Sequence, residues 1–152
     1  MGSQGGPSKF LRFGARQCAS AARVCALTRI LIADDHETVR KGVRSILESR
    51  KDVEKCYEAC DGEEAVRDAL ELKPDLIVLD LSMPKLDGLA AGKQIRKLLP
   101  DIPILMLSMH EGEGIVREAQ KAGLHGFVSK GEAGQVLLRA VDALLKGQTF
   151  FK

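Results

Sequence analysis

Two hydrophobic patterns alternate along the chain from residue 29 onward. Short apolar runs are followed by longer segments in which apolar residues recur at every third or fourth position. The runs are typical of strands and the longer segments of amphipathic helices. Strands are predicted at 29–33, 53–59, 76–80, 102–107 and 126–129. Helices are predicted at 38–49, 61–72, 87–99, 111–122 and 132–146, with Asp61 and Asp87 opening the second and third.

The segment 76–80, with the sequence LIVLD, is apolar up to its last residue. An uninterrupted run of this kind indicates a strand buried on both faces, as in a parallel sheet covered by helices on both sides. Regular alternation of strands and helices is typical of the same architecture. We therefore expect a doubly wound α/β fold of the (βα)5 type, with its working site at the carboxyl ends of the strands.

Composition and charge exclude several classes of partner. The chain has 152 residues, of which 45% are hydrophobic and 29% charged, which fits one ordinary globular domain. Because no apolar run is long enough to span a bilayer, we expect no membrane partner. The net charge of +2 is uneven: residues 1–29 carry five bases and no acid, which leaves 18 of the 23 bases against 21 acids. We therefore expect no direct nucleic-acid binding by the mildly acidic remainder.

The first 28 residues differ in composition from the rest. Residues 1–28 are rich in Gly and Ser and then in Arg and Ala, so we expect a disordered or loosely helical extension. An organelle transit peptide and a start assigned upstream of the true one are the alternatives. A single folded domain is expected at 29–147, followed by a short tail at 148–152. The spacing of the cysteines does not fit a zinc site, so we expect structural thiols in a reducing, cytoplasmic setting. They are Cys18, Cys25, Cys56 and Cys60.

Polar side chains stand at the carboxyl ends of four predicted strands. They are Asp34 and Asp35 after the first strand, Asp80 at the end of the third, Ser108 after the fourth and Lys130 after the fifth. Each of them alone is more often a helix cap or a solvated side chain. Because parallel strands share one carboxyl edge, however, we expect all of them at one site.

The chemistry of this predicted site requires a cation. Three carboxylates about 5 Å apart repel one another by roughly 3 kcal/mol per pair at an effective dielectric constant of 20. Oxygen ligands suit Mg²⁺, which would remove that repulsion. An ionised Asp can attack phosphorus to form an acyl phosphate. Mg²⁺, Lys130 and the Ser108 hydroxyl would then cover the oxygens of the transferring group.

Four stretches closely resemble the receiver (CheY-like) domain of two-component response regulators, in detail the NarL/FixJ-type subfamily. They are ADDH at 33–36, LDLSMPKLDG at 79–88, LSMH at 107–110 and GFVSK at 126–130. The resemblance covers about residues 29–146. It implies a flavodoxin-like three-layer sandwich, whose five-stranded parallel sheet has the order 2-1-3-4-5.

The resemblance implies a metal site and a phosphoacceptor. Asp80 would accept the phosphoryl group and also bind Mg²⁺. Asp35 would bind the ion directly, and Asp34 would act mainly through water. The backbone carbonyl of Ser82 would complete the protein ligands.

The resemblance also implies a switch. Lys130 would contact the phosphoryl group, and Ser108 would move to bond it. Phe127 takes the position of the aromatic switch residue, where relatives often carry Tyr, so a hydroxyl bond from that ring is absent. Gly131 stands where many relatives have a cis proline, and we expect glycine freedom to provide the bend there.

The implied function is phosphorelay signalling. A sensor histidine kinase would be the donor, and residues 111–146 (the fourth helix, fifth strand and fifth helix) would signal to an unknown downstream protein; a homodimer is a further alternative. Such domains are signalling proteins rather than enzymes, although they catalyse their own phosphorylation and dephosphorylation. One alternative is a truncated NarL/FixJ-type transcriptional regulator without its helix-turn-helix domain. Another is a haloacid-dehalogenase-type phosphohydrolase, but Ser82 replaces the second acid of its D-x-D pattern.

Overall fold

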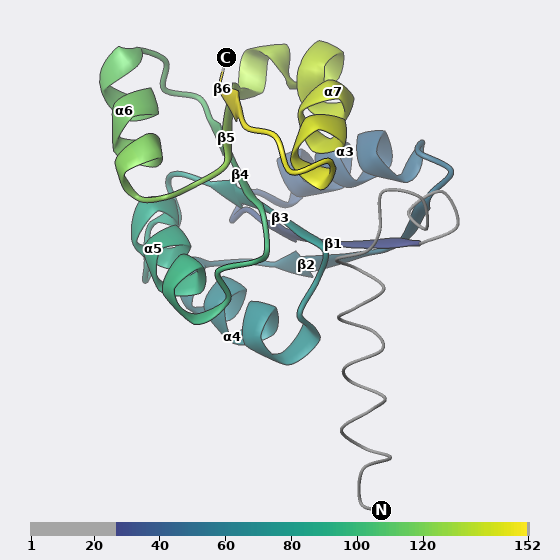
Figure 1. Ribbon diagram of the computed structural model, residues 1–152, viewed down its shortest axis with the longest axis horizontal. Coiled ribbons are helices and arrows are strands. Elements are labelled where there is room, and N and C mark those ends of the chain that lie inside the picture. The colour runs from purple at the N-terminus through teal and green to yellow at the C-terminus, as the bar shows by residue number, and fades with distance from the viewer. Residues whose placement is uncertain (1–26, 152) are drawn as a thin grey trace, which may run out of the picture.

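A parallel β-sheet forms the centre of residues 27–151, the part of the chain that the computed structural model describes (Figure 1). Its strands are β1 (Thr28–Ala33), β2 (Val53–Ala59), β3 (Leu76–Asp80), β4 (Ile104–Ser108), β5 (Gly126–Ser129) and β6 (Phe150–Phe151). Their order is β2-β1-β3-β4-β5-β6, and every neighbouring pair is parallel. The predicted extension, apart from its last two residues, lies outside the described part, as do Cys18, Cys25 and Lys152.

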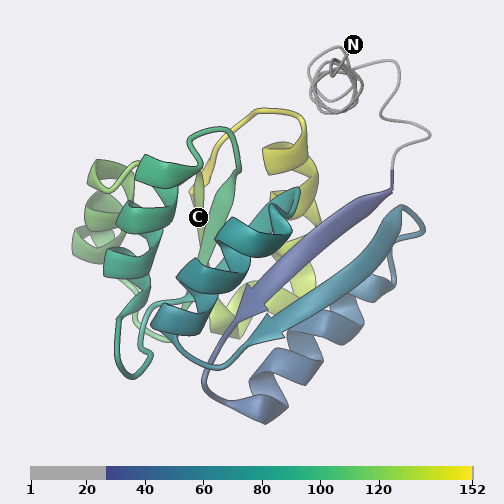
Figure 2. The ribbon, with the colours of Figure 1, turned by 90° about the horizontal axis from the view of Figure 1, so that it is seen from below.

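Helices cover both faces of the sheet (Figures 1 and 2). On one face lie α3 (Glu37–Glu48) and α7 (Ala133–Leu145); on the other lie α4 (Gly62–Leu72), α5 (Gly88–Leu98) and α6 (Glu113–Lys121). Figure 2 shows β1 and β2 running in the same direction between the two layers. Among the helices within residues 27–151, none has the length and apolar character needed to cross a bilayer.

The period of two along each strand divides the core between the two faces. In β1, Ile30 and Ile32 pack with α3 and α7, whereas Leu31 and Ala33 pack in the cluster of α4, α5 and α6. Every residue of β3 is buried, so its continuous apolar run serves both faces. This arrangement confirms the doubly wound α/β fold that the sequence predicts.

The starts of two helices agree with the predicted caps. The Asp61 carboxylate accepts a hydrogen bond from the backbone amide of Glu64, and the Asp87 carboxylate accepts one from Ala90, each at 2.8 Å. The helix predicted at 111–122 is shorter and spans Glu113–Lys121. Gly112 precedes it with a φ of +133°, so the chain is not helical at that point.

The prediction of five strands was wrong, because the predicted tail contributes β6. Phe150 and Phe151 pair with Gly126 and Phe127 of β5, and the Phe150 amide donates to the His125 carbonyl at 3.0 Å. A Cβ atom at Gly126 would lie 2.8 Å from the Phe150 carbonyl oxygen, so glycine allows the close approach. Two residues show no periodicity, and for that reason the pattern of the sequence could not reveal this strand.

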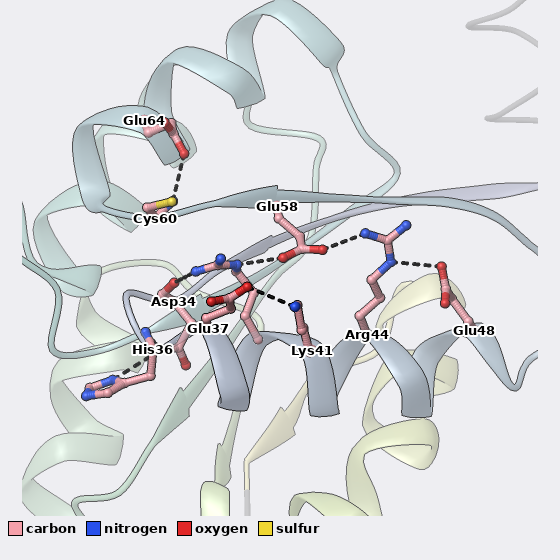
Figure 3. Close-up of polar contacts among 10 residues, drawn as sticks. Asp34, His36, Glu37, Lys41, Arg44, Glu48, Glu58, Cys60 and Glu64 are labelled. Atoms are coloured by element: carbon pink, nitrogen blue, oxygen red, sulfur yellow. Dashed lines mark hydrogen bonds and ion pairs between the residues drawn. The ribbon is translucent and has the colours of Figure 1, made fainter.

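A buried arginine ties the turn after β1 to β2. The guanidinium of Arg40, in α3, donates to the backbone carbonyl of Asp34 at 2.7 Å and to the Glu58 carboxylate at 2.6 Å. Glu58 is a residue of β2, and its carboxylate also pairs with Arg44 of α3, which in turn bonds Glu48 (Figure 3). The hydrogen bonds from Arg40 and then Arg44 lower the pKa of Glu58. This network fixes the backbone from which Asp34 projects.

Replacing Gly88 tests the packing behind the end of β3. A Cβ atom there would lie 2.1 Å from the Asp80 carbonyl oxygen, whereas one at Gly114 in α6 has no neighbour within 4 Å. We expect Gly88→Ala to lower the free energy of unfolding by about 2 kcal/mol or more, because the backbone must move. Gly114→Ala should raise it by about 0.5 kcal/mol, because the unfolded chain loses entropy. Urea denaturation followed by circular dichroism measures both, and equal effects would contradict the packing argument.

Replacing Glu58 tests the network through the dependence of stability on pH. Because the folded-state pKa of Glu58 is lowered, its contribution is complete above the ordinary value of 4.5 and is lost as the pH falls through the folded value. We expect Glu58→Gln to cost about 1–2 kcal/mol at neutral pH and progressively less in acid. Urea denaturation at neutral pH and below the ordinary pKa measures this difference. The exposed pair of Glu37 with Lys41 provides the control, because solvent screens this pair and Glu37→Gln should leave the free energy of unfolding almost unchanged. A constant cost for Glu58→Gln across the pH range would contradict the assignment.

Candidate functional site

The three predicted acids meet at the carboxyl edge of the sheet. Asp34 follows β1 directly and Asp80 ends β3, and the register of these neighbouring strands pairs Ala33 with Leu79. Asp34, Asp35, His36 and Asp80 each offer a ligand atom, and these atoms lie within 4.8 Å of one another. His36, which the sequence interpretation did not include, therefore belongs to the group.

Lys130 lies between two of the acids. Its ammonium nitrogen is 2.8 Å from Asp34 Oδ2 and 2.9 Å from Asp80 Oδ1, and 9% of its side chain is exposed. Burial alone would lower the pKa of Lys130, but the hydrogen bonds to Asp34 and Asp80 outweigh it and raise the pKa. Lys130 therefore stays charged and offsets part of the negative charge.

The Asp80 carboxyl retains an unfavourable environment in spite of Lys130. Burial raises the pKa of Asp80, the hydrogen bond from Lys130 acts in the opposite direction, and the charge of Asp34 adds to the increase. Three carboxylates face one ammonium group, so a further cation would stabilise the ionised form of Asp80. The donors are mainly carboxylate oxygens, which suit a hard divalent ion.

Asp34 and Asp35 differ in the freedom of their oxygens. The backbone amide of His36 donates to Asp34 Oδ1 at 2.8 Å, and Lys130 donates to Oδ2. The Asp35 side chain is 30% exposed, and its Oδ1 lies 3.0 Å from the His36 ring. The oxygens of Asp35 are thus the more accessible of the two sets, while the metal-binding roles that the resemblance implies for Asp34 and Asp35 stay predictions.

The remaining predicted residues lie in β4 and β5 or just after β3. Ser108 is fully buried, and its hydroxyl accepts a hydrogen bond from the His110 amide at 2.9 Å. Ser82 is exposed and lies two residues after Asp80. Binding of Mg²⁺ by its backbone carbonyl stays a prediction. Phe127 is 1% exposed and packs in the cluster of α4, α5 and α6.

One expectation about the local backbone was wrong. Gly131 is not among the glycines with positive φ, so the bend after Lys130 does not depend on glycine freedom. The chain instead forms a short 3₁₀ turn over Lys130–Glu132, in which the Ser129 hydroxyl accepts a hydrogen bond from the Gly131 amide.

Arg40 is the principal supporting residue of the candidate site that the sequence interpretation missed. Its guanidinium donates a hydrogen bond to the backbone carbonyl of Asp34. The residue as a whole is 9% exposed. The signal was a helical spacing: Arg40, Val43 and Leu47 are the buried residues of α3. A charged residue in line with apolar ones indicates a buried charge, although its partner Glu58 could not be identified from that pattern.

A family model described as the response regulator receiver domain matches residues 30–142. Among curated proteins, the transcriptional regulatory protein LiaR of Bacillus subtilis (strain 168) is 38% identical over 122 residues, which are 80% of this chain and 58% of LiaR. The chain therefore spans less than two thirds of the length of this relative.

Two solved structures show the same fold. A two-component response regulator of the LuxR family from Aurantimonas sp. SI85-9A1 has a TM-score of 0.79 and 35% identity, covering 82% of this chain and 89% of that one. The isolated REC domain of RcsB from Salmonella enterica serovar Typhimurium was solved with the phosphomimetic BeF₃⁻. It has a TM-score of 0.76 and 31% identity, and the match covers 83% of this chain and 94% of that one. These matches confirm the resemblance to the NarL/FixJ-type branch and do not favour the phosphohydrolase alternative. The chain belongs to the family of response regulator receiver domains, which are signalling domains.

Proposed function

We propose that Asp80 accepts a phosphoryl group from a sensor histidine kinase in a reaction that depends on Mg²⁺. The observation that carries the proposal is the position of Lys130 between the buried Asp34 and Asp80, with Asp35 exposed beside them. A relative of the same fold was solved with a phosphomimetic, which supports the same chemistry here. The free thiols of Cys56 and Cys60 suit a reducing compartment, and we propose the cytoplasm as the setting.

The metal would be held by Asp35, Asp80 and the carbonyl of Ser82, with Asp34 acting through water. When bound, Mg²⁺ would supply positive charge beside the transferring phosphoryl oxygens. The donor set fits, because the acids contribute oxygens and Asp35 remains accessible to solvent. His36 adjoins Asp35 and adds a donor that Mg²⁺ does not require.

The transfer itself requires an ionised Asp80. A carboxylate oxygen of Asp80 attacks phosphorus, and the bond from phosphorus to the imidazole nitrogen of the donor histidine breaks. The electron pair of that bond stays on the imidazole, and the product is an acyl phosphate on Asp80. Lys130 already lies 2.9 Å from the Asp80 carboxylate and would follow the new phosphoryl oxygens. Attack by water on phosphorus later returns inorganic phosphate and the free carboxylate.

Signalling would depend on Ser108 and Phe127. The phosphoryl group adds negative charge and acceptor oxygens, towards which the Ser108 hydroxyl would turn. Phe127 lies in β5, which α6 and α7 flank, and these three elements form the proposed output face (α6, β5 and α7). The change would bias an existing equilibrium and present this face to a downstream protein or to a second copy of the chain.

Phosphorylation by acetyl phosphate tests the role of Asp80. In the presence of Mg²⁺, the intact mass of the wild type should increase by one phosphoryl group, whereas Asp80→Ala should gain none. Removal of Mg²⁺ with EDTA should abolish the gain, and Asp101→Ala, at an exposed turn, should retain it. An increase in the mass of Asp80→Ala would show that another residue is the acceptor. If the mass of neither protein increased, the domain would be a docking module without phosphoacceptor activity.

Replacing Lys130 separates phosphoryl transfer from metal binding. We expect Lys130→Met to slow phosphorylation by acetyl phosphate by about 100-fold, because a positive group aimed at the transferring oxygens is lost. Mg²⁺ should bind at least as tightly, because Asp34 and Asp80 lose a competing cation. Calorimetry measures the affinity and time-resolved mass spectrometry the rate. Lys146→Met, which removes an exposed ammonium group from the end of α7, should change neither. An unchanged rate in Lys130→Met would exclude the proposed role.

A further inference from the structure

Two hydroxyl groups at the ends of neighbouring strands hold the loop 109–112. Ser108 ends β4 and Ser129 ends β5, and the strand register pairs them. The Ser108 hydroxyl accepts from the His110 amide at 2.9 Å, and the Ser129 hydroxyl donates to Glu111 Oε2 at 2.8 Å. One serine thus holds the backbone of the loop, and the other holds its acidic side chain.

The orientation of the Ser129 hydroxyl is fixed by two partners. Ser129 is 3% exposed, and its oxygen accepts from the Gly131 amide at 3.3 Å while its proton is donated to Glu111. Glu111 is an exposed residue, yet its carboxylate is hydrogen-bonded to Ser129 of β5 and does not extend freely into solvent. The bond is charge-assisted, and such hydrogen bonds are stronger than neutral ones.

The loop 109–112 is exposed throughout, and α6 packs against the core through the partly buried Ile115 and Val116 and the buried Ala119. Within α6, all of whose residues are described, Ala119 is the only one that is buried, whereas α7 buries six residues. Gly112 has a φ of +133°, and a Cβ atom added there would meet no atom within 4 Å. Met109 is 70% exposed. The loop therefore has space to move once its hydroxyl contacts are released.

The loop also forms part of a hollow in the proposed output face. This hollow has a volume of about 560 Å³, and Glu111 and Ser129 both line it, together with Val116 of α6 and Phe127 of β5. A displacement of Glu111 would change its shape beside the predicted aromatic switch residue. The bond between Glu111 and Ser129 therefore connects the phosphorylation site with the surface that would report it.

We propose that the Glu111–Ser129 hydrogen bond is a latch that holds the loop 109–112 in its unphosphorylated position, which makes Glu111 a positioning residue for Ser108. The inference rests on the proposed function, in which Ser108 leaves the His110 amide to bond the phosphoryl group. Because the latch stabilises the resting arrangement alone, breaking it favours the arrangement that binds a phosphoryl mimic. Ser129 itself is less suitable for the test, because it also accepts from Gly131 beside Lys130.

Binding of the phosphoryl mimic beryllium trifluoride in the presence of Mg²⁺ tests the latch. Calorimetry should show that Glu111→Ala binds the mimic roughly five-fold more tightly than the wild type, the factor that corresponds to one hydrogen bond. Glu111→Gln should show a smaller increase, because its amide oxygen still accepts from Ser129. In NMR spectra without the mimic, the His110 amide resonance of Glu111→Ala should move towards its position in the complex.

Glu113→Ala is the matched control, because it removes the same charge from the same hollow. Glu113 is 91% exposed in its side chain and faces Arg117 at 3.9 Å, so its replacement should leave the affinity unchanged. An equal increase in Glu113→Ala would assign the effect to charge and overturn the latch. Unchanged binding by Glu111→Ala, with binding by the wild type, would overturn the latch alone. Absence of binding by the wild type would overturn the latch together with the proposed function.

Discussion

The contact of Lys130 with Asp34 and Asp80 is the interaction on which the site depends. Two buried carboxylates side by side would repel each other and lose hydration, and one ammonium group within 2.9 Å of both makes their burial tolerable. Lys130 is 96 residues from Asp34 along the chain. The strand order β1-β3-β4-β5 brings their carboxyl ends to one edge, so the parallel sheet is the device that assembles the charges.

The acids are positioned chiefly through their backbone. Arg40 holds the carbonyl of Asp34, and Gly88 lets the start of α5 approach the carbonyl of Asp80 more closely than any side chain would permit. Neither residue touches the carboxylate it supports. The geometry of the site therefore depends on contacts behind the strand ends, and changes there would alter chemistry without removing a functional group.

Local pattern was sufficient for most of the fold and for the main residues of the site. The uninterrupted run of β3 indicated a sheet covered on both faces, and polar residues next to apolar strands indicated the acids and Lys130. What the sequence did not show depends on partners distant in the chain. β6 is two residues long and is defined by its pairing with β5, while Arg40 is explained by Glu58. Glu111 fits a helical pattern, yet the helix begins only after Gly112, whose φ is positive. The Glu111 side chain instead accepts a hydrogen bond from Ser129.

The formal charges explain why a divalent cation and a mobile Ser108 hydroxyl would both belong to the proposed mechanism. Asp34, Asp35 and Asp80 carry three negative charges and Lys130 one positive charge, so an anionic phosphoryl donor would approach a site of charge −2. A divalent ion would bring that charge to zero. After the proposed transfer, a phosphoryl group of about −2 would replace the single charge of Asp80 and leave an excess of about one negative charge. Ser108, buried at the adjacent strand end, would supply a neutral donor for this excess, and its movement would be the step that couples the proposed chemistry to the loop that it now holds.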